Sequence, residues 1–275
     1  MSKHSPASST GPKRVRAHHL RAMKERGEKI VALTAYDAVT SALLDAAGVD
    51  LLLVGDSIGN TMHGHDTTLP VTVEDMIPAA RGVARAAGRA FVVVDLPFGS
   101  YESGPEQALA TAVRFMKETG AHGVKLEGGE RVVEQVRAVS QAGIPVVGHL
   151  GYTPQSEHAL GGPRVQGRDD AEQLLADARA IAGAGAIAVV LEMVPVPLAQ
   201  RVTEALAVPT IGIGAGPGCD GQILVWTDMA GMGDWAPRFV KQYARLGEAL
   251  REAAQTYAGE VRDGSFPAAE HGFDK

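Results

Sequence analysis

The stretch that decides the fold is Asp50-Leu51-Leu52-Leu53-Val54-Gly55-Asp56-Ser57. Its four consecutive apolar residues end at a glycine, which is the pattern of a short strand buried on both faces in a parallel sheet. Asp56 follows directly after that turn. Because α/β folds bind their ligands at the carboxyl ends of the strands, we expect the Asp56 carboxylate at the rim of the sheet.

The same pattern recurs along the chain. Four further apolar runs, at 91–95, 123–127, 144–149 and 188–192, also end in an ionisable residue. In all, eight apolar strands are expected at residues 30–35, 50–54, 91–95, 124–127, 144–150, 186–192, 210–214 and 222–226, mostly separated by helical segments. This alternation predicts an α/β protein with a (β/α)₈ barrel, the TIM barrel. An open doubly wound sheet is the alternative.

Composition limits the class of protein and its partners. The 275 residues fit one large domain, and the net charge of −6 argues against nucleic acid as a partner, since such sites need clustered Lys and Arg. The single cysteine, Cys219, excludes an intramolecular disulfide and is compatible with a reducing compartment. No apolar run approaches about 18 residues, so we expect no membrane span and a cytoplasmic location.

The two ends of the chain differ from the middle. Residues 1–16 are basic and contain no acid, which predicts a disordered tail; an organelle transit peptide is the alternative. A short helix is expected at 19–26, then a single barrel domain over 17–266 and a C-terminal tail over 267–275. A helix or helix pair is expected at 237–258. The loop 151–168 is long enough to suggest a lid over the substrate.

Three acids stand at the ends of successive strands. Asp56, Asp95 and Glu127 would bring three hard oxygen donors to one rim, with no nearby Cys and no HxxxH pair. Such a donor set suits Mg²⁺ better than zinc. Taken singly, each acid could instead be a helix cap or an exposed loop residue.

Three other ionisable residues belong to the same rim. Lys125 lies two residues before Glu127 on one strand, so both side chains face the same side, and a buried Lys needs an anionic partner. That partner could be a protein carboxylate or a substrate carboxylate. Glu192 follows an apolar run and could be a general base, or the ion-pair partner of Lys125. His149 could be a structural hydrogen bonder or a functional residue.

Some motifs are weaker than they look. Residues 216–221 fit GxGxxG by letter, but an apolar strand and not a helix follows, so the context for dinucleotide binding is missing. We interpret His63 and His65 as loop contacts, not metal ligands. Cys219 has no identifiable base partner, so a nucleophilic role is not expected.

Six segments, in order and with matching spacing, resemble one known family. They are Val54-Gly55-Asp56-Ser57, Gly64-His65-Asp66-Thr67-Thr68-Leu69-Pro70-Val71-Thr72, Asp95-Leu96-Pro97-Phe98, Val124-Lys125-Leu126-Glu127-Gly128-Gly129, Gly148-His149-Leu150-Gly151-Tyr152-Thr153-Pro154-Gln155 and Gly212-Ile213-Gly214-Ala215-Gly216. The family is ketopantoate hydroxymethyltransferase, of pantothenate biosynthesis. The resemblance runs from about residue 19 to about residue 266.

The resemblance implies a fold, an assembly and a reaction. It implies a barrel of the phosphoenolpyruvate/pyruvate type, a homodecamer, and hydroxymethyl transfer from 5,10-methylenetetrahydrofolate to 3-methyl-2-oxobutanoate through a Mg²⁺-stabilised enolate. It implies Mg²⁺ at Asp56, Asp95 and Glu127, and Glu192 as the proton acceptor. It implies keto-acid contacts from Ser57, Asp95 and Lys125, to which Asp56 and His149 are added as substrate-binding candidates.

Two other functions remain open at this point. A related barrel enzyme could use the same chemistry to cleave or rearrange a C–C or P–C bond, and it would need no folate. A non-catalytic scaffold barrel is the second possibility. The converging acids argue against a scaffold, which has no need of them.

Overall fold

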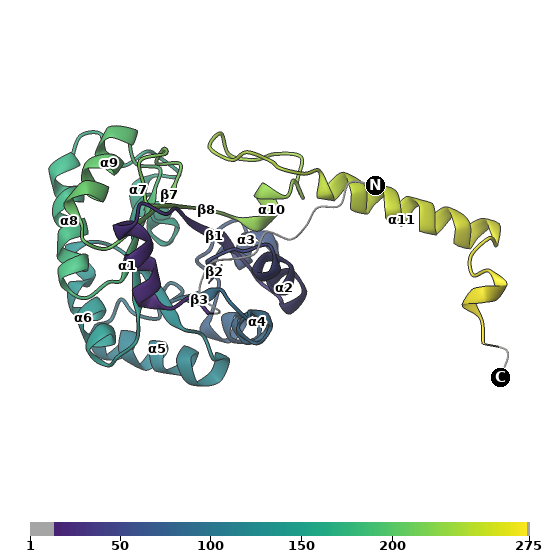
Figure 1. Cartoon of the computed structure of the whole chain (residues 1–275), viewed down its shortest axis with the longest axis horizontal. Coiled ribbons are helices and arrows are strands. Elements are labelled where there is room, and N and C mark those ends of the chain that lie inside the picture. Colours follow the sequence, from purple (N-terminus) through teal and green to yellow (C-terminus); the bar gives the residue numbers. More distant parts are fainter. Residues whose placement is uncertain (1–13, 274–275) are drawn as a thin grey trace. The chain divides into compact units, whose positions relative to one another are not determined.

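The structure is a computed structural model, and it describes residues 14–273. Within these residues, eight parallel strands close into a barrel in chain order, with β1 paired to both β2 and β8 (Figure 1). The strands are β1 (Ile30–Thr34), β2 (Leu51–Val54), β3 (Phe91–Asp95), β4 (Gly123–Glu127), β5 (Val146–Gly151), β6 (Ala188–Glu192), β7 (Thr210–Ile213) and β8 (Gly221–Leu224). The predicted TIM barrel is confirmed, and the open doubly wound sheet is excluded.

Helices follow most of the strands and cover the outside of the barrel. One helix, α1 (Ala17–Glu25), precedes β1. The helices after β1 are α2 (Ala38–Ala46), α3 (Ile58–Thr61), α4 (Val73–Ala86), α5 (Pro105–Thr119), α6 (Val133–Gln141), α7 (Glu157–Leu160), α8 (Ala171–Gly183) and α9 (Val196–Ala205). Short 3₁₀ turns lie at η1 (Glu130–Val132) and η2 (Pro154–Ser156). Thus the loop predicted at 151–168 contains η2 and α7.

Local sequence signals set several helix ends. Asp37 caps α2 by accepting a hydrogen bond from the Thr40 backbone N–H. Thr72 and Asp75 form a reciprocal capping box at the start of α4. Gly120, with φ of 79°, ends α5 in the left-handed conformation that glycine adopts without strain. These signals are readable from the sequence because each depends on residues within one turn.

The chain divides after Val225 into two compact units, the barrel and a C-terminal unit with α10 (Trp226–Met229), α11 (Leu246–Asp263) and η3 (Ala269–His271). The helix predicted at 237–258 begins only at Leu246. The Tyr243 N–H donates to the Met229 carbonyl, and the Leu246 N–H donates to the Ala230 carbonyl. These bonds hold the segment before Leu246 beside residues 229–230, so its backbone does not form helical hydrogen bonds. The predicted domain limits, 17–266 and 267–275, stay a prediction.

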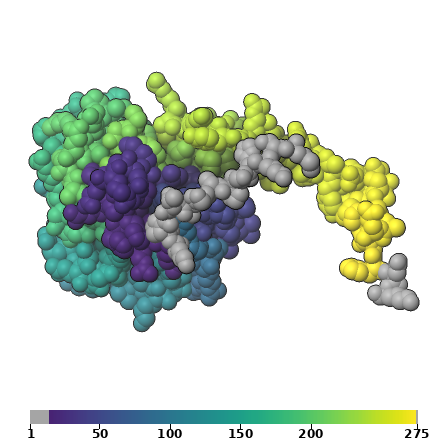
Figure 2. Space-filling view, viewed as in Figure 1, coloured from purple at the N-terminus to yellow at the C-terminus, as the bar shows by residue number. Residues whose placement is uncertain are grey.

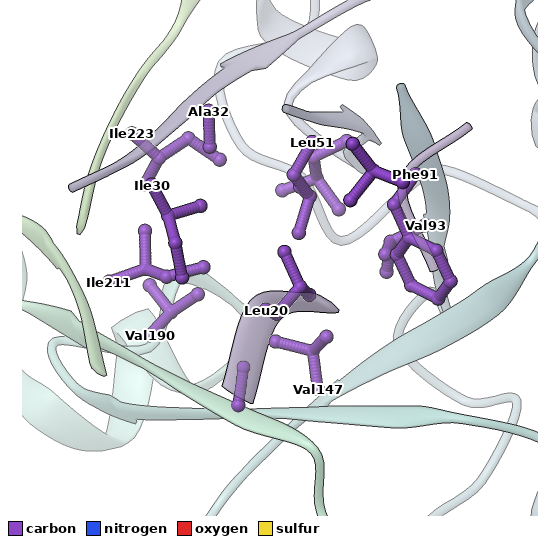
Figure 3. Packing of buried hydrophobic residues seen from close by; sticks show 13 residues of the cluster. Leu20, Ile30, Ala32, Leu51, Phe91, Val93, Val147, Val190, Ile211 and Ile223 are labelled. Carbon is purple, nitrogen blue, oxygen red and sulfur yellow. The ribbon is translucent and has the colours of Figure 1, made fainter. Parts of the chain in front are cut away.

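The N-terminal helix packs against one end of the barrel. Leu20 of α1 is fully buried in a cluster with Ile30, Leu51 and Phe91, the first residues of β1, β2 and β3 (Figure 3). α1 therefore covers the end of the barrel at which the strands begin. Figure 2 shows α1, in dark purple, on the face of the barrel unit toward the viewer.

The segment before α1 differs from its prediction. Val15 is 1% exposed and belongs to the same cluster, and its N–H donates to the Arg89 carbonyl at 2.7 Å. Arg14 donates to the carbonyl of Ala87 at 3.2 Å. Disorder is therefore the wrong prediction for residues 14–16. The segment is polar, but its one apolar side chain, Val15, packs into the hydrophobic core. The rest of that predicted tail, residues 1–13, lies outside the described residues.

None of the helices within residues 14–273 combines the length and the hydropathy needed to cross a bilayer.

Candidate active site

All seven predicted site residues line one cavity. It measures about 120 Å³ and lies where the strands end. Its polar lining is Asp56, Ser57, Asp95, Lys125, Glu127, His149 and Glu192, and its apolar lining includes Leu53, Val190, Ile213, Ile223, Leu224 and Val225. The charged lining residues come from β2 to β6, and most of the apolar ones come from β6 to β8, so the charged and apolar residues gather on different parts of the wall.

Strand register explains why these residues meet. Asp95 is the register partner of Lys125, and Glu127 is the partner of His149. Glu192 is the partner of Gly151 at the end of β5. Since alternate residues of a strand share a face, Lys125 and Glu127 enter the cavity together, as the sequence predicted.

Lys125 forms a buried ion pair with Asp95. Its Nζ lies 2.6 Å from Asp95 Oδ1 and 3.7 Å from Glu127 Oε1, and the side chains of Lys125 and Asp95 are 4% and 2% exposed. Burial acts to lower the pKa of Lys125, but Asp95, Glu127 and Asp56 together outweigh it and raise that pKa. Of the two kinds of partner considered for this ammonium, the structure shows protein carboxylates.

His149 bridges two carboxylates. Its Nδ1 lies 3.1 Å from Glu127 Oε1, and its Nε2 lies 3.2 Å from Glu192 Oε2. Burial and Lys125 act to lower the pKa of His149, but its bonds to Glu127 and Glu192 raise it to about 9. An imidazolium has an N–H on each ring nitrogen, so it hydrogen-bonds to Glu127 through Nδ1 and lies at ion-pair distance from Glu192 through Nε2. Lys125 Nζ also lies 3.2 Å from Nδ1, and we interpret this as a contact, because Nδ1 already donates to Glu127.

The bridge corrects one hypothesis. Glu192 was considered as the ion-pair partner of Lys125, and the structure pairs it with His149 instead. The Glu192 side chain is 16% exposed, whereas that of Glu127 is 1% exposed. Of the two carboxylates that His149 contacts, Glu192 is therefore the one that a bound molecule can reach more easily.

The buried carboxylates carry more negative charge than the nearby cations offset. Burial, followed by repulsion from Asp95 and Glu127, raises the pKa of Asp56 to about 8. Burial also raises the pKa of Asp95, although Lys125 opposes this. For Glu127, the effect of burial is outweighed by the bond to His149 and the charge of Lys125, so its pKa is lowered.

The fit of a metal ion depends on which carboxylates are free to bind it. Among residues 14–273, no three His, Cys, Asp or Glu side chains are arranged to ligate one ion. Both oxygens of Glu127 are engaged, Oε1 by His149 and Oε2 by the Gln155 backbone N–H at 3.0 Å. Both oxygens of Asp95 are engaged as well, Oδ1 by Lys125 Nζ at 2.6 Å and Oδ2 by the Asp56 backbone N–H at 3.0 Å. A carboxylate oxygen that accepts one bond keeps a second lone pair, and Mg²⁺ needs only one or two carboxylates beside water and substrate, so Asp56 and Asp95 fit such an ion. The place of Glu127 in the predicted metal site stays a prediction.

Three buried residues that the sequence did not single out support the site. Tyr36 places its hydroxyl 2.8 Å from Ser57 Oγ. The Tyr101 hydroxyl forms hydrogen bonds with Gln155 Oε1 and with the Glu127 backbone carbonyl. Gln155 donates from its side chain to the Asp56 carboxylate and from its backbone N–H to the Glu127 carboxylate. Gln155 ends one of the family-like segments, which was its only signal; nothing in the sequence pattern marks either tyrosine.

The weaker motifs stay apart from the cavity lining. His63 and His65 contact each other edge to face, with ring centroids 5.8 Å apart. Cys219 is buried, and burial raises the pKa of its thiol, which disfavours the nucleophilic thiolate.

Solved structures define the class of the fold. The chain resembles 2,3-dimethylmalate lyase, a PEP mutase/isocitrate lyase superfamily member, with a TM-score of 0.58 and 21% identity over 94% of this chain and 90% of that one. It resembles phosphonopyruvate hydrolase, solved in complex with oxalate and Mg²⁺, with a TM-score of 0.60 and 14% identity over 93% of each chain. The chain therefore shares its barrel fold with these two proteins.

Sequence relatives narrow the class to a family. The family model described as ketopantoate hydroxymethyltransferase matches residues 14–269. A protein of Leifsonia xyli named 3-methyl-2-oxobutanoate hydroxymethyltransferase is 62% identical, covering 97% of each chain. A protein of Saccharopolyspora erythraea with the same name is 62% identical, covering 95% of this chain and 90% of its own. The chain belongs to the ketopantoate hydroxymethyltransferase family, and it is a transferase.

Proposed function

We propose that the chain transfers a hydroxymethyl group from 5,10-methylenetetrahydrofolate to 3-methyl-2-oxobutanoate. The products would be 2-dehydropantoate (ketopantoate) and tetrahydrofolate, in a step of pantothenate biosynthesis. The relatives' shared name supports this substrate. The observation that carries the proposal is the two-sided cavity, since its charged side suits a 2-oxo carboxylate and its apolar side suits a branched alkyl group.

The residues divide into binding and proton transfer. Lys125 and Ser57 hold the carboxylate end of the oxo acid, and Val190, Ile213 and neighbouring apolar residues enclose its isopropyl group. Asp56 and Asp95 would hold Mg²⁺, with Glu127 beside them, and the ion would supply the positive charge that stabilises an enolate. The donor set of Asp56 and Asp95 supports this assignment.

Glu192 acts as the base. It accepts the proton from C3 of the oxo acid, and C3 forms a bond to the methylene carbon of the folate as the bond from that carbon to one folate nitrogen breaks. The hydroxyl of a water molecule then bonds to the methylene carbon as the bond to the second folate nitrogen breaks. The two nitrogens leave as N–H groups, with one proton from C3 and one from water. His149, with Nε2 3.2 Å from Glu192 Oε2, holds the Glu192 carboxylate in place. A positioned general base contributes about 10²–10⁴-fold in rate.

The test is formation of ketopantoate with and without 5,10-methylenetetrahydrofolate and Mg²⁺. We expect product only when both are present. Folate-independent cleavage or rearrangement of a C–C or P–C bond would replace this proposal by the rival barrel chemistry. Absence of any turnover, with intact folded protein, would favour a scaffold.

We also propose, on the family resemblance, that the chain forms a homodecamer in the cytoplasm and takes only small molecules as substrates. Sedimentation velocity should give the mass of ten chains. A monomer or dimer at micromolar concentration would contradict the assembly.

A further inference from the structure

Gln155 is a buried amide that contacts two of the site carboxylates. Its Nε2 donates to Asp56 Oδ2 at 2.9 Å and to the Leu96 carbonyl at 3.0 Å. Its backbone N–H donates to Glu127 Oε2 at 3.0 Å. One residue of η2 therefore holds carboxylates that reach the cavity from β2 and β4.

Tyr101 determines which way the amide points. Its hydroxyl lies 2.6 Å from Gln155 Oε1, and the Glu127 backbone N–H donates to the same hydroxyl at 3.3 Å. With its oxygen lone pair occupied by Glu127, the hydroxyl gives its proton to Oε1. A flipped amide would set Oε1 against two acceptors, Asp56 and the Leu96 carbonyl, so every contact agrees on one orientation.

The network also links the third carboxylate. The Asp56 backbone N–H donates to Asp95 Oδ2 at 3.0 Å. Thus Gln155 fixes one oxygen of Asp56, and the backbone of Asp56 fixes one oxygen of Asp95. A shift of Gln155 changes the angle at which the Asp56 carboxylate faces the cavity, although Gln155 does not approach the apolar wall that would hold the substrate.

We propose that Gln155 is a positioning residue for the divalent-cation site, and that Tyr101 acts on the Asp56 carboxylate of this site through Gln155. The inference rests on the proposed function, because that function places the cation at Asp56 and Asp95. It goes further in assigning roles to two uncharged residues that touch neither substrate nor reacting atoms. In this arrangement, Tyr101 fixes the orientation of the Gln155 amide, and the amide fixes the orientation of the Asp56 carboxylate. The orientation of that carboxylate then determines the affinity for the cation.

The experiment measures Mn²⁺ binding to the purified protein without substrate, from the electron paramagnetic resonance signal of free Mn²⁺. The variants are Tyr101→Phe, Gln155→Met and the double variant. Phe keeps the ring and Met keeps the length of the side chain. The matched control is Thr111→Val, which removes a buried hydroxyl that donates to the Ser100 carbonyl at 2.7 Å, beside Tyr101 but outside the network.

We expect each single variant to bind Mn²⁺ about 3- to 10-fold more weakly than wild type, the range for losing one hydrogen bond, and Thr111→Val to bind as wild type does. In the Gln155→Met background, Tyr101→Phe should have no further effect, because its route to the carboxylate is already lost. A merely structural role for Tyr101 would weaken binding by the same factor in both backgrounds.

Each other outcome decides against the inference. Wild-type affinity in Tyr101→Phe, or independent effects in the double variant, would overturn it while leaving the proposed function intact. If Tyr101→Phe does not fold, Gln155→Met alone decides, and unchanged Mn²⁺ affinity there would overturn it. Failure of wild type itself to bind Mn²⁺ would remove the cation site, and with it both proposals.

Discussion

At the scale of single residues, Lys125 holds together a group of carboxylates that would otherwise repel one another. Its ammonium pairs with Asp95 at 2.6 Å in a nearly solvent-free site. Lys125→Met should therefore leave a buried carboxylate without its partner and destabilise the protein by about 3–5 kcal/mol. Urea unfolding at pH 7 without divalent cations measures this change.

The matched control for that variant is Arg114→Met, which removes an exposed cation paired with Glu74 and Glu118. Exposed pairs of this kind contribute about 0–1 kcal/mol. Equal losses in the two variants would show that the buried pair gives no more stability than a surface one.

Glu192 permits a test of mechanism apart from binding. Glu192→Gln keeps the shape of the side chain but removes the proton acceptor. Exchange of the C3 proton of 3-methyl-2-oxobutanoate with deuterated water, in the presence of Mg²⁺, should slow by about 10²–10⁴-fold. Binding of the oxo acid should persist, since Lys125 and Ser57 remain.

The control is Glu204→Gln, an exposed glutamate of α9 that should exchange as wild type does. Exchange at the wild-type rate in Glu192→Gln would end the assignment and direct the search for the base to His149.

The site was largely predictable because its ionisable residues leave a mark in the sequence. An acid, Lys or His at the end of an apolar strand has no packing role, and the six residues chosen in this way line one cavity together with Ser57, which the family resemblance added. Their roles stay predictions. Gln155, Tyr101 and Tyr36 were not predicted as site residues. The role of a neutral hydrogen-bonding side chain can be recognised only when its partners, which are far away in sequence, are seen beside it. The partner of Glu192 escaped for the same reason.

At the scale of elements, the segment between α5 and β4 contains His122, which forms a hydrogen bond with the backbone of β3. His122 Nδ1 accepts a hydrogen bond from the Val92 N–H at 2.9 Å, which only the neutral ring can do. Burial, with smaller effects from Arg14 and Arg16, lowers the pKa of His122 below its usual 6.5. Between the lowered pKa and 6.5 the unfolded chain binds the proton more tightly than the folded chain.

It follows that the contribution of His122 to stability is present above pH 6.5 and is lost as the pH falls through the interval below that value. We expect His122→Asn, which keeps an acceptor but does not titrate, to lose less stability than wild type between pH 7.5 and pH 5. Urea midpoints measured across this range give the difference. Parallel curves for the two proteins would show that His122 does not contribute.

Helix starts that depend on local signals are readable from the sequence, whereas the start that depends on distant pairing was predicted wrongly. The starts of α2, α4 and α5 follow from Asp37, Thr72 and Pro105, each within one turn of the helix. The start of α11 was placed too early, because 243–247 pairs with 229–231 and the sequence shows no sign of that pairing.

At the scale of the whole barrel, its two ends have different tasks. The residues proposed for chemistry follow the ends of the strands, whereas α1 and Val15 close the end where the strands begin. In TIM barrels the first end generally carries activity and the second carries stability. The sequence predicted a closed barrel of eight strands, which the pairing of β1 with β8 confirms, but the role of α1 as a cover required the structure.

This division makes Leu20 a test of how independent the two ends are. Leu20 is fully buried at the end opposite the cavity (Figure 3). Leu20→Ala should lower the free energy of unfolding by about 2–5 kcal/mol, through lost burial and the cavity left behind. At 15 °C, where the variant is still folded, kcat should stay within about twofold of wild type, because the strands transmit no change of register to the rim.

Val39→Ala, at a side chain that is 74% exposed on α2, should change neither quantity. Urea unfolding and ketopantoate formation, measured on the same samples, separate stability from activity. A fall in kcat that matches the loss of stability would show that the cover at one end also sets the geometry of the other.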